Sequence, residues 1–289
     1  MIIGFIIVCG LVGVFFLFSI LLANFLGFSG DTSQSNKIAV INIENVISRS
    51  TDIVRQIKKY SDDNSIKAIV LRINSPGGSV ASSQEIYNEL LKTRKNSNKK
   101  VITSMGNISA SGGYYIACAS DKIVANPGTL TGSIGVIMAF SNMEELMGKI
   151  GIKSEVIKSG KYKDMGSPMR KFTADDRRLL QDLIDDVHDQ FVNVVAKGRN
   201  LEIKRAKELS DGRIFTGRQA LKVGLVDELG SFEDAIEIGA KMVHIQGKPK
   251  IVSEKKEKNI FFKLLEGKVL SYFSSQSPLL PGLQFLWQY

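Results

Sequence analysis

Residues 66–80 read IKAIVLRINSPGGSV, and this stretch decides the fold. The first eight are dense in apolar and β-branched side chains, a pattern typical of a strand buried on both faces. Pro76 then fixes a turn, and the two glycines after it let the backbone come close to a ligand. A helix is expected directly afterwards, over 79–93. The stretch therefore predicts one strand–turn–helix unit of an α/β domain.

Strands and helices alternate in the same way along the rest of residues 37–253. This alternation predicts a largely parallel, buried sheet within one domain. Thr173 is expected to cap the longest helix, with Asp175 and Asp176 in its first turn. Strands are expected at 37–43, 66–73, 101–105, 123–125, 134–138 and 154–157, and helices at 51–60, 79–93, 142–150, 173–197, 203–209, 217–222 and 232–242.

The N-terminal part has a different composition. Residues 1–28 contain no charged residue and, as a helix, exceed the roughly 30 Å hydrocarbon core of a bilayer. They lack the basic n-region and the A-x-A site of a cleaved signal peptide. We expect one uncleaved transmembrane helix at 1–28, followed by a polar linker at 29–36. Only Lys37 closely follows this segment, so the positive-inside rule gives no orientation.

Charge and cysteine content exclude several function classes. The 38 basic and 29 acidic residues give a net charge of +9, but the lysines are spread along the chain. No basic stripe is interleaved with aromatic residues, so nucleic-acid binding is not expected. Cys9 and Cys118 fall in different environments, which predicts neither a disulfide nor a metal site. Residues 254–289 form a basic and apolar C-terminal extension that we expect to pack on protein rather than lipid.

Residues 108–121, ISASGGYYIACASD, hold the candidate nucleophile. Ser111 precedes two glycines and a short apolar segment that can begin a helix. Its hydroxyl can therefore be held on a tight turn beside N–H groups free to bind an anion. An ordinary helix N-cap explains a serine there equally well. Ser109 is a competing nucleophile, and the residues alone do not decide between the two.

The two histidines are not expected to act as the general base for this serine. Neither His188 nor His244 follows a strand or a glycine turn, so a Ser-His-Asp triad is not expected. Residues 158–167, KSGKYKDMGS, carry three lysines, which form either a solvated loop or a source of one base. A lysine base must be neutral, so its ordinary pKa of about 10.4 must fall by roughly 2–3 units. Ser133, in TLTGSIGV, is either structural or a partner of a catalytic group.

Five motifs in order carry a resemblance that covers about residues 37–245. They are NSPGG, SASGGYYIA, TGSIGV, KSGKYKD and DGRIFTGRQALKVGLVDELG. On these motifs the chain resembles the signal peptide peptidase A (protease IV) family, in its short form. The resemblance implies the Clp protease/crotonase-like fold, a ββα superhelix. It also implies site residues: Ser111 as nucleophile, Lys163 as general base, Ser133 as hydrogen-bond partner of that lysine, and an oxyanion hole from the N–H groups of Gly78 and Gly112, with Gly77 completing the turn.

The same resemblance implies a function. The chain is expected to be a membrane-anchored serine endopeptidase with a Ser-Lys dyad that degrades residual signal peptides after secretion, without metal or cofactor. It is expected to form a homo-octamer whose Ser and Lys meet across subunits, with the catalytic domain on the outer, periplasmic or extracytoplasmic, side of the bacterial inner membrane. Two alternatives remain: a non-proteolytic crotonase-fold acyl-CoA enzyme, and a membrane scaffold that hydrolyses nothing.

Overall fold

The computed structural model describes residues 15, 18, 36–97, 99–254 and 284–286. The chain divides into two units, Met1–Asn36 and Lys37–Tyr289. In the described part of the chain, no helix is long and apolar enough to cross a bilayer.

Several sequence-based predictions fall mainly on residues outside the described ranges. The expected transmembrane helix at 1–28, with Cys9, and the expected linker at 29–36 are described only at Phe15, Phe18 and Asn36. The C-terminal extension is described at Glu254 and over 284–286. The fold and the site below are therefore those of the second unit.

A sheet of eight strands forms the centre of the second unit within the described ranges. Its pairs are parallel except β6 with β7, as the alternating sequence predicts. β4 is the longest of these strands, and two strands share one of its edges. It pairs with β5 over its first half and with β6 over its last three residues. The strands are β1 Lys37–Glu44, β2 Ile66–Ser75, β3 Gly77–Ser79, β4 Lys100–Ala110, β5 Lys122–Ala125, β6 Leu130–Gly132, β7 Ile214–Thr216, β8 Glu228–Leu229, β9 Lys250–Ser253 and β10 Gln284–Leu286, of which β3 and β10 pair outside the large sheet.

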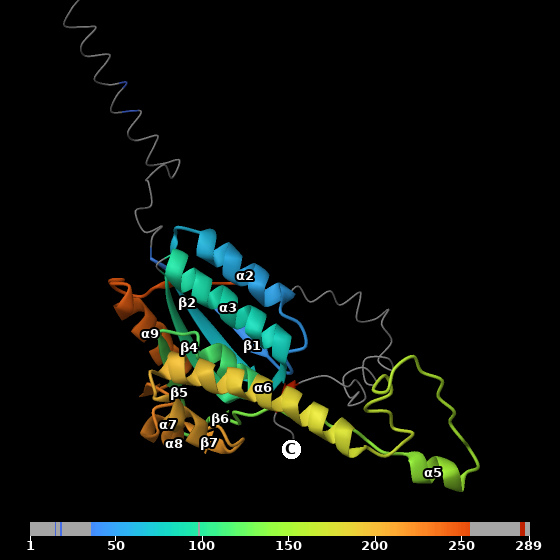
Figure 1. Ribbon diagram of the computed structural model, residues 1–289. Helices are drawn as coiled ribbons and strands as arrows, with labels where there is room; N and C mark the ends of the chain where they lie inside the picture. The colour runs from blue at the N-terminus through green and yellow to red at the C-terminus, as the bar shows by residue number, and fades with distance from the viewer. Residues whose placement is uncertain (1–14, 16–17, 19–35, 98, 255–283, 287–289) are drawn as a thin grey trace, which may run out of the picture. The chain divides into compact units, whose positions relative to one another are not determined.

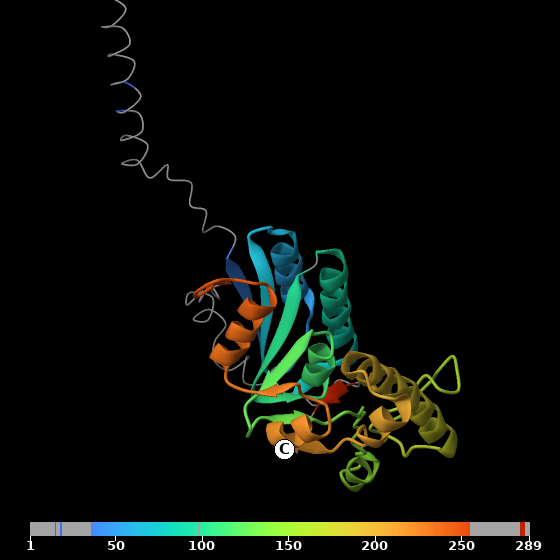
Figure 2. The ribbon, with the colours of Figure 1, turned by 90° about the vertical axis from the view of Figure 1, so that its left-hand side faces the viewer.

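Helices cover both faces of this sheet. α2 and α3 lie on one face and α9 on the other (Figures 1 and 2). Thr173 caps α6, as predicted, and forms a reciprocal capping box with Asp176. The helices are α2 Thr51–Asp62, α3 Val80–Asn96, α4 Gly112–Ala117, α5 Glu144–Lys149, α6 Ala174–Arg199, α7 Ile203–Glu208, α8 Gly217–Lys222 and α9 Phe232–Met242.

The run IKAIVLRI is apolar throughout because its strand, β2, is buried from both sides. Ile69, Leu71 and Ile73 belong to the core beneath α2, α3 and α4. Ala68 and Val70 alternate with them and pack in the core beneath α9. Each such large side chain contributes about 1.5–3 kcal/mol by leaving water, so the central strands anchor the unit.

Two predicted strands are wrong. Residues 134–138 are not a continuous strand; the strand there is β6, which ends at Gly132, and the chain turns at Ser133, where φ is 49°. Residues 154–157 form no strand and are exposed. Their β-branched side chains suit a strand, but that preference requires a neighbouring strand and a core to face, and residues 154–157 pair with no strand in the described ranges.

One buried ion pair joins the end of α6 to the segment before β8. The Arg199 guanidinium donates two hydrogen bonds to the Asp227 carboxylate, at 2.7 and 3.0 Å, and its side chain is only 7% exposed. Arg199 Nε also donates to the Gly224 carbonyl, and Asp227 accepts from the Ile123 N–H. The pair therefore connects the C-terminal helices to β5.

Asp227→Asn should destabilise the protein by about 3–5 kcal/mol, because it leaves the Arg199 charge buried without its counter-ion. The free energy of unfolding from urea denaturation measures this loss. Glu228→Gln is the matched control, since Glu228 pairs with Lys122 at an exposed site and its loss should cost less than about 1 kcal/mol. Equal effects of the two substitutions would contradict the role of the buried pair.

Candidate active site

The ends of β2 and β4 bring the two glycine-rich motifs together. The strands are parallel neighbours, so both leave the sheet at the same edge. Their register shifts between Ile73 and Ser75, after which Ser75 lies opposite Ser109. Asn74 holds this shift, because its Oδ1 accepts from the N–H groups of Asn107, at 3.1 Å, and Ile108, at 3.3 Å. The turns that follow the two strands therefore start side by side.

The first turn is fixed by Ser75 and made possible by glycine. Ser75 Oγ donates to the Asn45 carbonyl at 2.5 Å and accepts from the Gly77 N–H at 3.1 Å. Gly77 has φ of 108°, which L side chains rarely adopt. At Gly78 a Cβ would lie 2.3 Å from the Ile47 carbonyl oxygen, so any side chain there would collide with backbone.

The hydrogen bonds of β3 show which way the Gly78 amide points. The Ile47 N–H donates to the Gly77 carbonyl, and the Ser79 N–H donates to the Ile47 carbonyl, both at 2.8 Å. Successive residues of a strand direct their polar groups to opposite edges. The N–H and C=O of Gly78 therefore point to the other edge of β3, away from Ile47.

Ser111 forms a sharp turn between β4 and α4. Its N–H donates to the Gly132 carbonyl, and its own carbonyl accepts from the Tyr115 N–H, both at 2.8 Å. Its backbone has φ 52° and ψ −117°, a conformation that costs a non-glycine residue about 1–3 kcal/mol. Ser111 Oγ is buried and has no hydrogen-bond partner among the described residues. A strained strand–turn–helix junction of this kind presents the nucleophile in the α/β-hydrolases.

The Ser111 turn packs directly against the Gly77–Gly78 turn. A Cβ at Gly112 would lie 3.2 Å from the Gly78 nitrogen and 2.6 Å from Ser83 Oγ. Only glycine fits between these groups. The structure therefore brings Ser111, Gly112, Gly77 and Gly78 together, and adds Ser83, which the sequence analysis did not single out because a serine inside a helix carries no distinguishing pattern.

Ser109 and Cys118 are the other candidate nucleophiles in this segment. Ser109 Oγ is buried without a partner, like that of Ser111, but Ser109 lies inside β4 with no positive φ. Cys118 is fully buried, and burial raises the pKa of its thiol to about 12. A thiol with that pKa supplies almost no thiolate at neutral pH.

Ser133 lies next to the Ser111 turn. It follows Gly132, whose carbonyl accepts from the Ser111 N–H, and its own N–H donates to the Arg213 carbonyl at 2.8 Å. Ser133 lines a cavity of about 500 Å³ together with Asp185, His188 and Asp211. His188 Nε2 lies 2.7 Å from the Ser210 carbonyl, so this ring nitrogen is engaged by the main chain.

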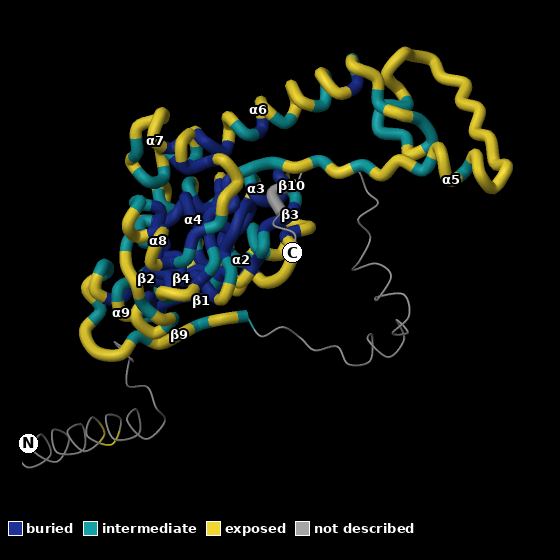
Figure 3. The backbone as a smooth tube through the Cα atoms, turned by 90° about the horizontal axis from the view of Figure 1, so that it is seen from below, coloured by how far each residue is buried: buried dark blue, intermediate teal, exposed yellow. Residues whose placement is uncertain are grey.

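The lysine motif lies on an arm formed by residues 139–172, which extends from the sheet and carries α5 (Figures 1 and 3). Lys158 pairs with Asp164 at 2.6 Å, and Lys161 pairs with Asp175. Lys163 is exposed, and its Nζ has no hydrogen-bond or ion-pair partner among the described residues. No bond joins it to Ser111 within this chain.

Ion pairs on the arm hold the loop that contains Lys163. Asp164 contacts Arg170 at 3.0 Å as well as Lys158, and these bonds, chiefly that from Arg170, lower the pKa of the Asp164 carboxyl to about 2. Asp164 therefore remains ionised at neutral pH. The position of Lys163 is thus set by a charged network, although its own amine is left unpaired.

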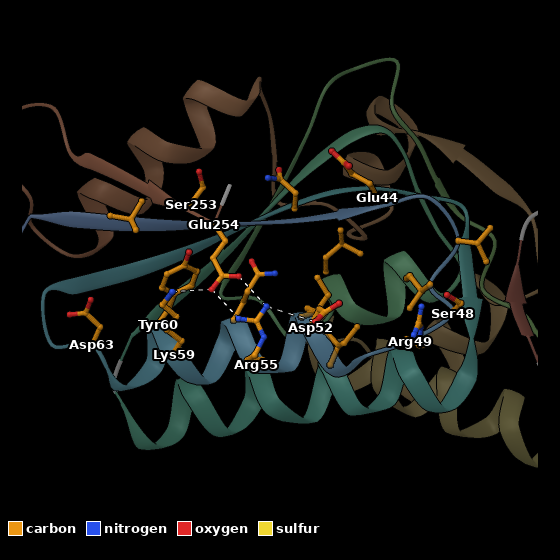
Figure 4. A pocket seen from close by; sticks show the side chains of 18 residues that line it. Glu44, Ser48, Arg49, Asp52, Arg55, Lys59, Tyr60, Asp63, Ser253 and Glu254 are labelled. Carbon is orange, nitrogen blue, oxygen red and sulfur yellow. Dashed lines mark hydrogen bonds and ion pairs between the residues drawn. The ribbon is translucent and has the colours of Figure 1, made fainter. Parts of the chain in front are cut away.

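A larger cavity, of about 930 Å³, lies between α2 and the β1–β9 edge (Figure 4). Glu254 points toward α2 there, accepting from Lys59 at 3.0 Å and from Arg55 at 3.2 Å. These hydrogen bonds lower the pKa of the Glu254 carboxyl, and the bond from Lys59 has the largest effect. None of the predicted site residues lines this cavity.

Comparisons with known proteins show which family the chain matches. Residues 93–246 match the model of peptidase family S49, and residues 32–130 match that of the Clp proteases. The chain is 48% identical over 212 residues to a putative protease of Synechocystis sp., covering 73% of this chain and 76% of that protein. It is 42% identical over 213 residues to a putative signal peptide peptidase SppA of Enterococcus faecium, covering 73% and 60% of the two.

A more distant relative is also informative. The chain is 32% identical over 230 residues to the chloroplastic serine protease SPPA of Arabidopsis thaliana, covering 75% of this chain and 34% of that protein. The chain thus spans about a third of that relative and less than two thirds of the Enterococcus protein. The predicted α/β fold with a Clp protease-like domain is confirmed.

Ser111→Gly should raise the free energy of unfolding by about 1 kcal/mol. Glycine adopts the Ser111 backbone conformation without strain, which outweighs its greater entropy in the unfolded chain. Urea denaturation measures the gain. Ser111→Ala is the matched control, because it keeps the strain and removes a hydroxyl without a partner, so its stability should stay near that of the parent. A loss of stability in Ser111→Gly would show that this turn is not strained.

Proposed function

Because the chain belongs to peptidase family S49 and is a serine peptidase, we propose that it is a membrane-anchored endopeptidase that degrades residual signal peptides after secretion. The observation that carries this proposal is the strained Ser111 turn packed against the Gly77–Gly78 turn. A peptide bond placed there lies next to both a nucleophile and backbone N–H donors.

In the proposed reaction Ser111 Oγ attacks the carbonyl carbon of the scissile bond. The Ser111 hydroxyl is free of other hydrogen bonds in the described part of the chain, so a base can take its proton. The developing oxyanion accepts from the Gly78 N–H, which points away from Ile47, and from the Gly112 N–H in the first turn of α4. The amine product leaves, and water then hydrolyses the acyl-enzyme.

Lys163 is the proposed base, supplied by a neighbouring subunit. The neutral Lys163 amine takes the Ser111 proton and gives it to the leaving amine. Ser133, beside the Ser111 turn, accepts a hydrogen bond from the Lys163 amine. Two features support supply from a neighbour. The other two lysines of the motif are paired while Lys163 is not, and Lys163 lies on the arm without a bond to its own Ser111.

The arm is also suited to contact another copy of the chain. It exposes large apolar side chains that a monomer would leave in water. The proposed assembly is a homo-octamer in which each arm reaches the site of the next subunit and its apolar surface becomes buried. The exposed side chains are Leu146, Ile150, Ile152, Val156 and Ile157.

The proposed organisation follows the composition of the chain. Residues 1–28 serve as the transmembrane anchor, 29–36 as linker, 37–253 as the protease domain with its ββα superhelix, and 254–289 as a C-terminal extension. The charge-free composition of residues 1–28 supports the anchor. The placement of the protease domain on the outer side of the bacterial inner membrane is proposed from the family resemblance.

Mixing two inactive variants tests the shared site. Ser111→Ala should abolish peptide cleavage, and Lys163→Ala should reduce it by about 10²–10⁴-fold. Co-expressed in equal amounts, the two variants should regain about one quarter of the parental activity, because half of the subunits carry Ser111 and half of their neighbours carry Lys163. A fluorogenic peptide assay measures the recovery.

Lys161→Ala is the matched control for the lysine motif, since Lys161 is exposed and pairs with Asp175. It should leave cleavage close to the parental rate. Mixed oligomers that form but stay inactive would contradict a dyad shared between subunits, and full activity of folded Lys163→Ala would contradict the dyad itself.

A further inference from the structure

The loop of residues 210–213, which directly precedes β7, fixes the position of Ser133. The Ser133 N–H donates to the Arg213 carbonyl at 2.8 Å, and Ser133 is only 7% exposed. Asp211, from the same loop, lines the cavity of about 500 Å³ that Ser133 also lines. A group that binds the Ser133 hydroxyl from this cavity therefore lies in the field of the Asp211 carboxylate.

A free carboxylate in this cavity would oppose the proposed reaction. The Lys163 amine acts as a base only in its neutral form. A nearby negative charge favours the protonated form of an amine, because it stabilises the ammonium ion. The effect is larger in a site from which water is excluded, as it is between two subunits. Catalysis beside Ser133 therefore requires that the charge of Asp211 be neutralised.

The Arg213 guanidinium provides this neutralisation. Its Nε–H lies 2.8 Å from each of the two Asp211 carboxylate oxygens, and its Nη2 donates to Oδ2 as well. The main-chain N–H of Arg213 donates to Oδ1 at 3.1 Å. These bonds, chiefly those from the Arg213 side chain, lower the pKa of the Asp211 carboxyl to about 2. Asp211 is thus ionised at neutral pH, but the pair as a whole carries no net charge.

Two other titratable groups, Asp185 and His188, line the cavity from α6. Asp185 Oδ1 accepts from the Gln181 side-chain amide at 2.8 Å, which is a neutral partner. His188 Nε2 lies 2.7 Å from the Ser210 main-chain carbonyl. Both groups are the same in the parent and in the variants below, so neither affects the comparison between them. Asp211 is the carboxylate of this cavity that has a cationic partner among the described residues.

The arm brings its own charges together with Lys163. Asp164, the next residue, is paired with two cations of the arm. Lys161 and the Tyr162 hydroxyl both contact the Asp175 carboxylate. In the described structure, the carboxylates next to Lys163 are therefore already paired.

We propose that Arg213 is a positioning residue for the proteolytic reaction: it holds the Asp211 carboxylate and so leaves the Lys163 amine of a neighbouring subunit free to act as a base beside Ser133. This role rests on the proposed function, because only a shared Ser-Lys dyad brings that amine into the cavity. Arg213 touches no reacting atom and acts through Asp211. Without its guanidinium, the freed carboxylate pairs with the lysine and keeps it protonated.

The pH dependence of kcat/KM tests this role, measured with a fluorogenic peptide on the full-length assembled protein. In Arg213→Gln the acidic limb of the profile should lie about 0.5–1.5 pH units higher than in the parent, because a unit charge a few ångström away in a partly solvated site has an effect of this size. The protonated lysine is inactive, so at a fixed pH on the limb the variant should be about 3- to 30-fold slower. Above the limb the two rates should be close to equal.

Two further variants reverse or remove the effect. Asp211→Asn alone leaves an unpaired guanidinium beside the cavity and should move the limb to lower pH. The double variant Arg213→Gln/Asp211→Asn lacks both charges of the pair, so its limb should return to the parental position. Arg205→Gln is the matched control, because Arg205 forms a similarly exposed pair with Glu208 and neither residue lines the cavity. It should leave the limb in place.

The possible outcomes separate this role from the proposed function. An unmoved limb in an active Arg213→Gln protein would overturn the role of Arg213. A loss of activity that is equal at every pH, and that Asp211→Asn does not restore, would also overturn it by showing a purely structural effect. Full activity of folded Lys163→Ala refutes the dyad and, with it, the role of Arg213. Inactive Lys163→Ala together with an unmoved limb refutes the role of Arg213 alone.

Discussion

The parallel pairing of β2 with β4 is the interaction on which the rest of the structure depends. It makes both strands end at one edge, and the register shift after Ile73, held by Asn74, aligns the turns that follow. The Gly77–Gly78 turn and the Ser111 turn then pack so closely that Gly112 has no room for a Cβ. Large apolar side chains buried on both faces stabilise the two strands. A rigid sheet edge can therefore hold a strained serine.

Much of this fold could be predicted, because burial on both faces of a parallel sheet leaves an unmistakable apolar run. The strands 134–138 and 154–157 were wrong because β propensity does not show whether a partner strand exists. The closeness of Ser111 to Gly78 follows from strand order, which the sequence shows only through the family resemblance. The pairing of β10 with β3 depends on a contact between residues more than 200 positions apart, and three residues are too few to show a period.

Among the described residues, the Ser111 side of the site is assembled, whereas Lys163 makes no bond to it. Backbone strain at Ser111, a hydroxyl without a partner among the described residues and a Gly78 N–H directed away from Ile47 are all fixed by the fold. Lys163, in contrast, lies on an arm whose ion pairs set the loop but leave its amine unpaired in the described structure. Under the proposed shared site, the protease domain folds with Ser111 in place, and cleavage requires Lys163 of a neighbouring subunit. This arrangement also gives the exposed apolar side chains of the arm a role.

Covalent labelling decides whether the strained turn makes Ser111, rather than Ser109, the nucleophile. The assembled protein would be treated with a peptidyl β-lactone, digested, and the modified residue located by fragment mass spectrometry of the peptide that contains both serines. We expect an adduct on Ser111 Oγ that is absent from Ser111→Ala protein. An adduct on Ser109, or labelling that persists in Ser111→Ala, would contradict it.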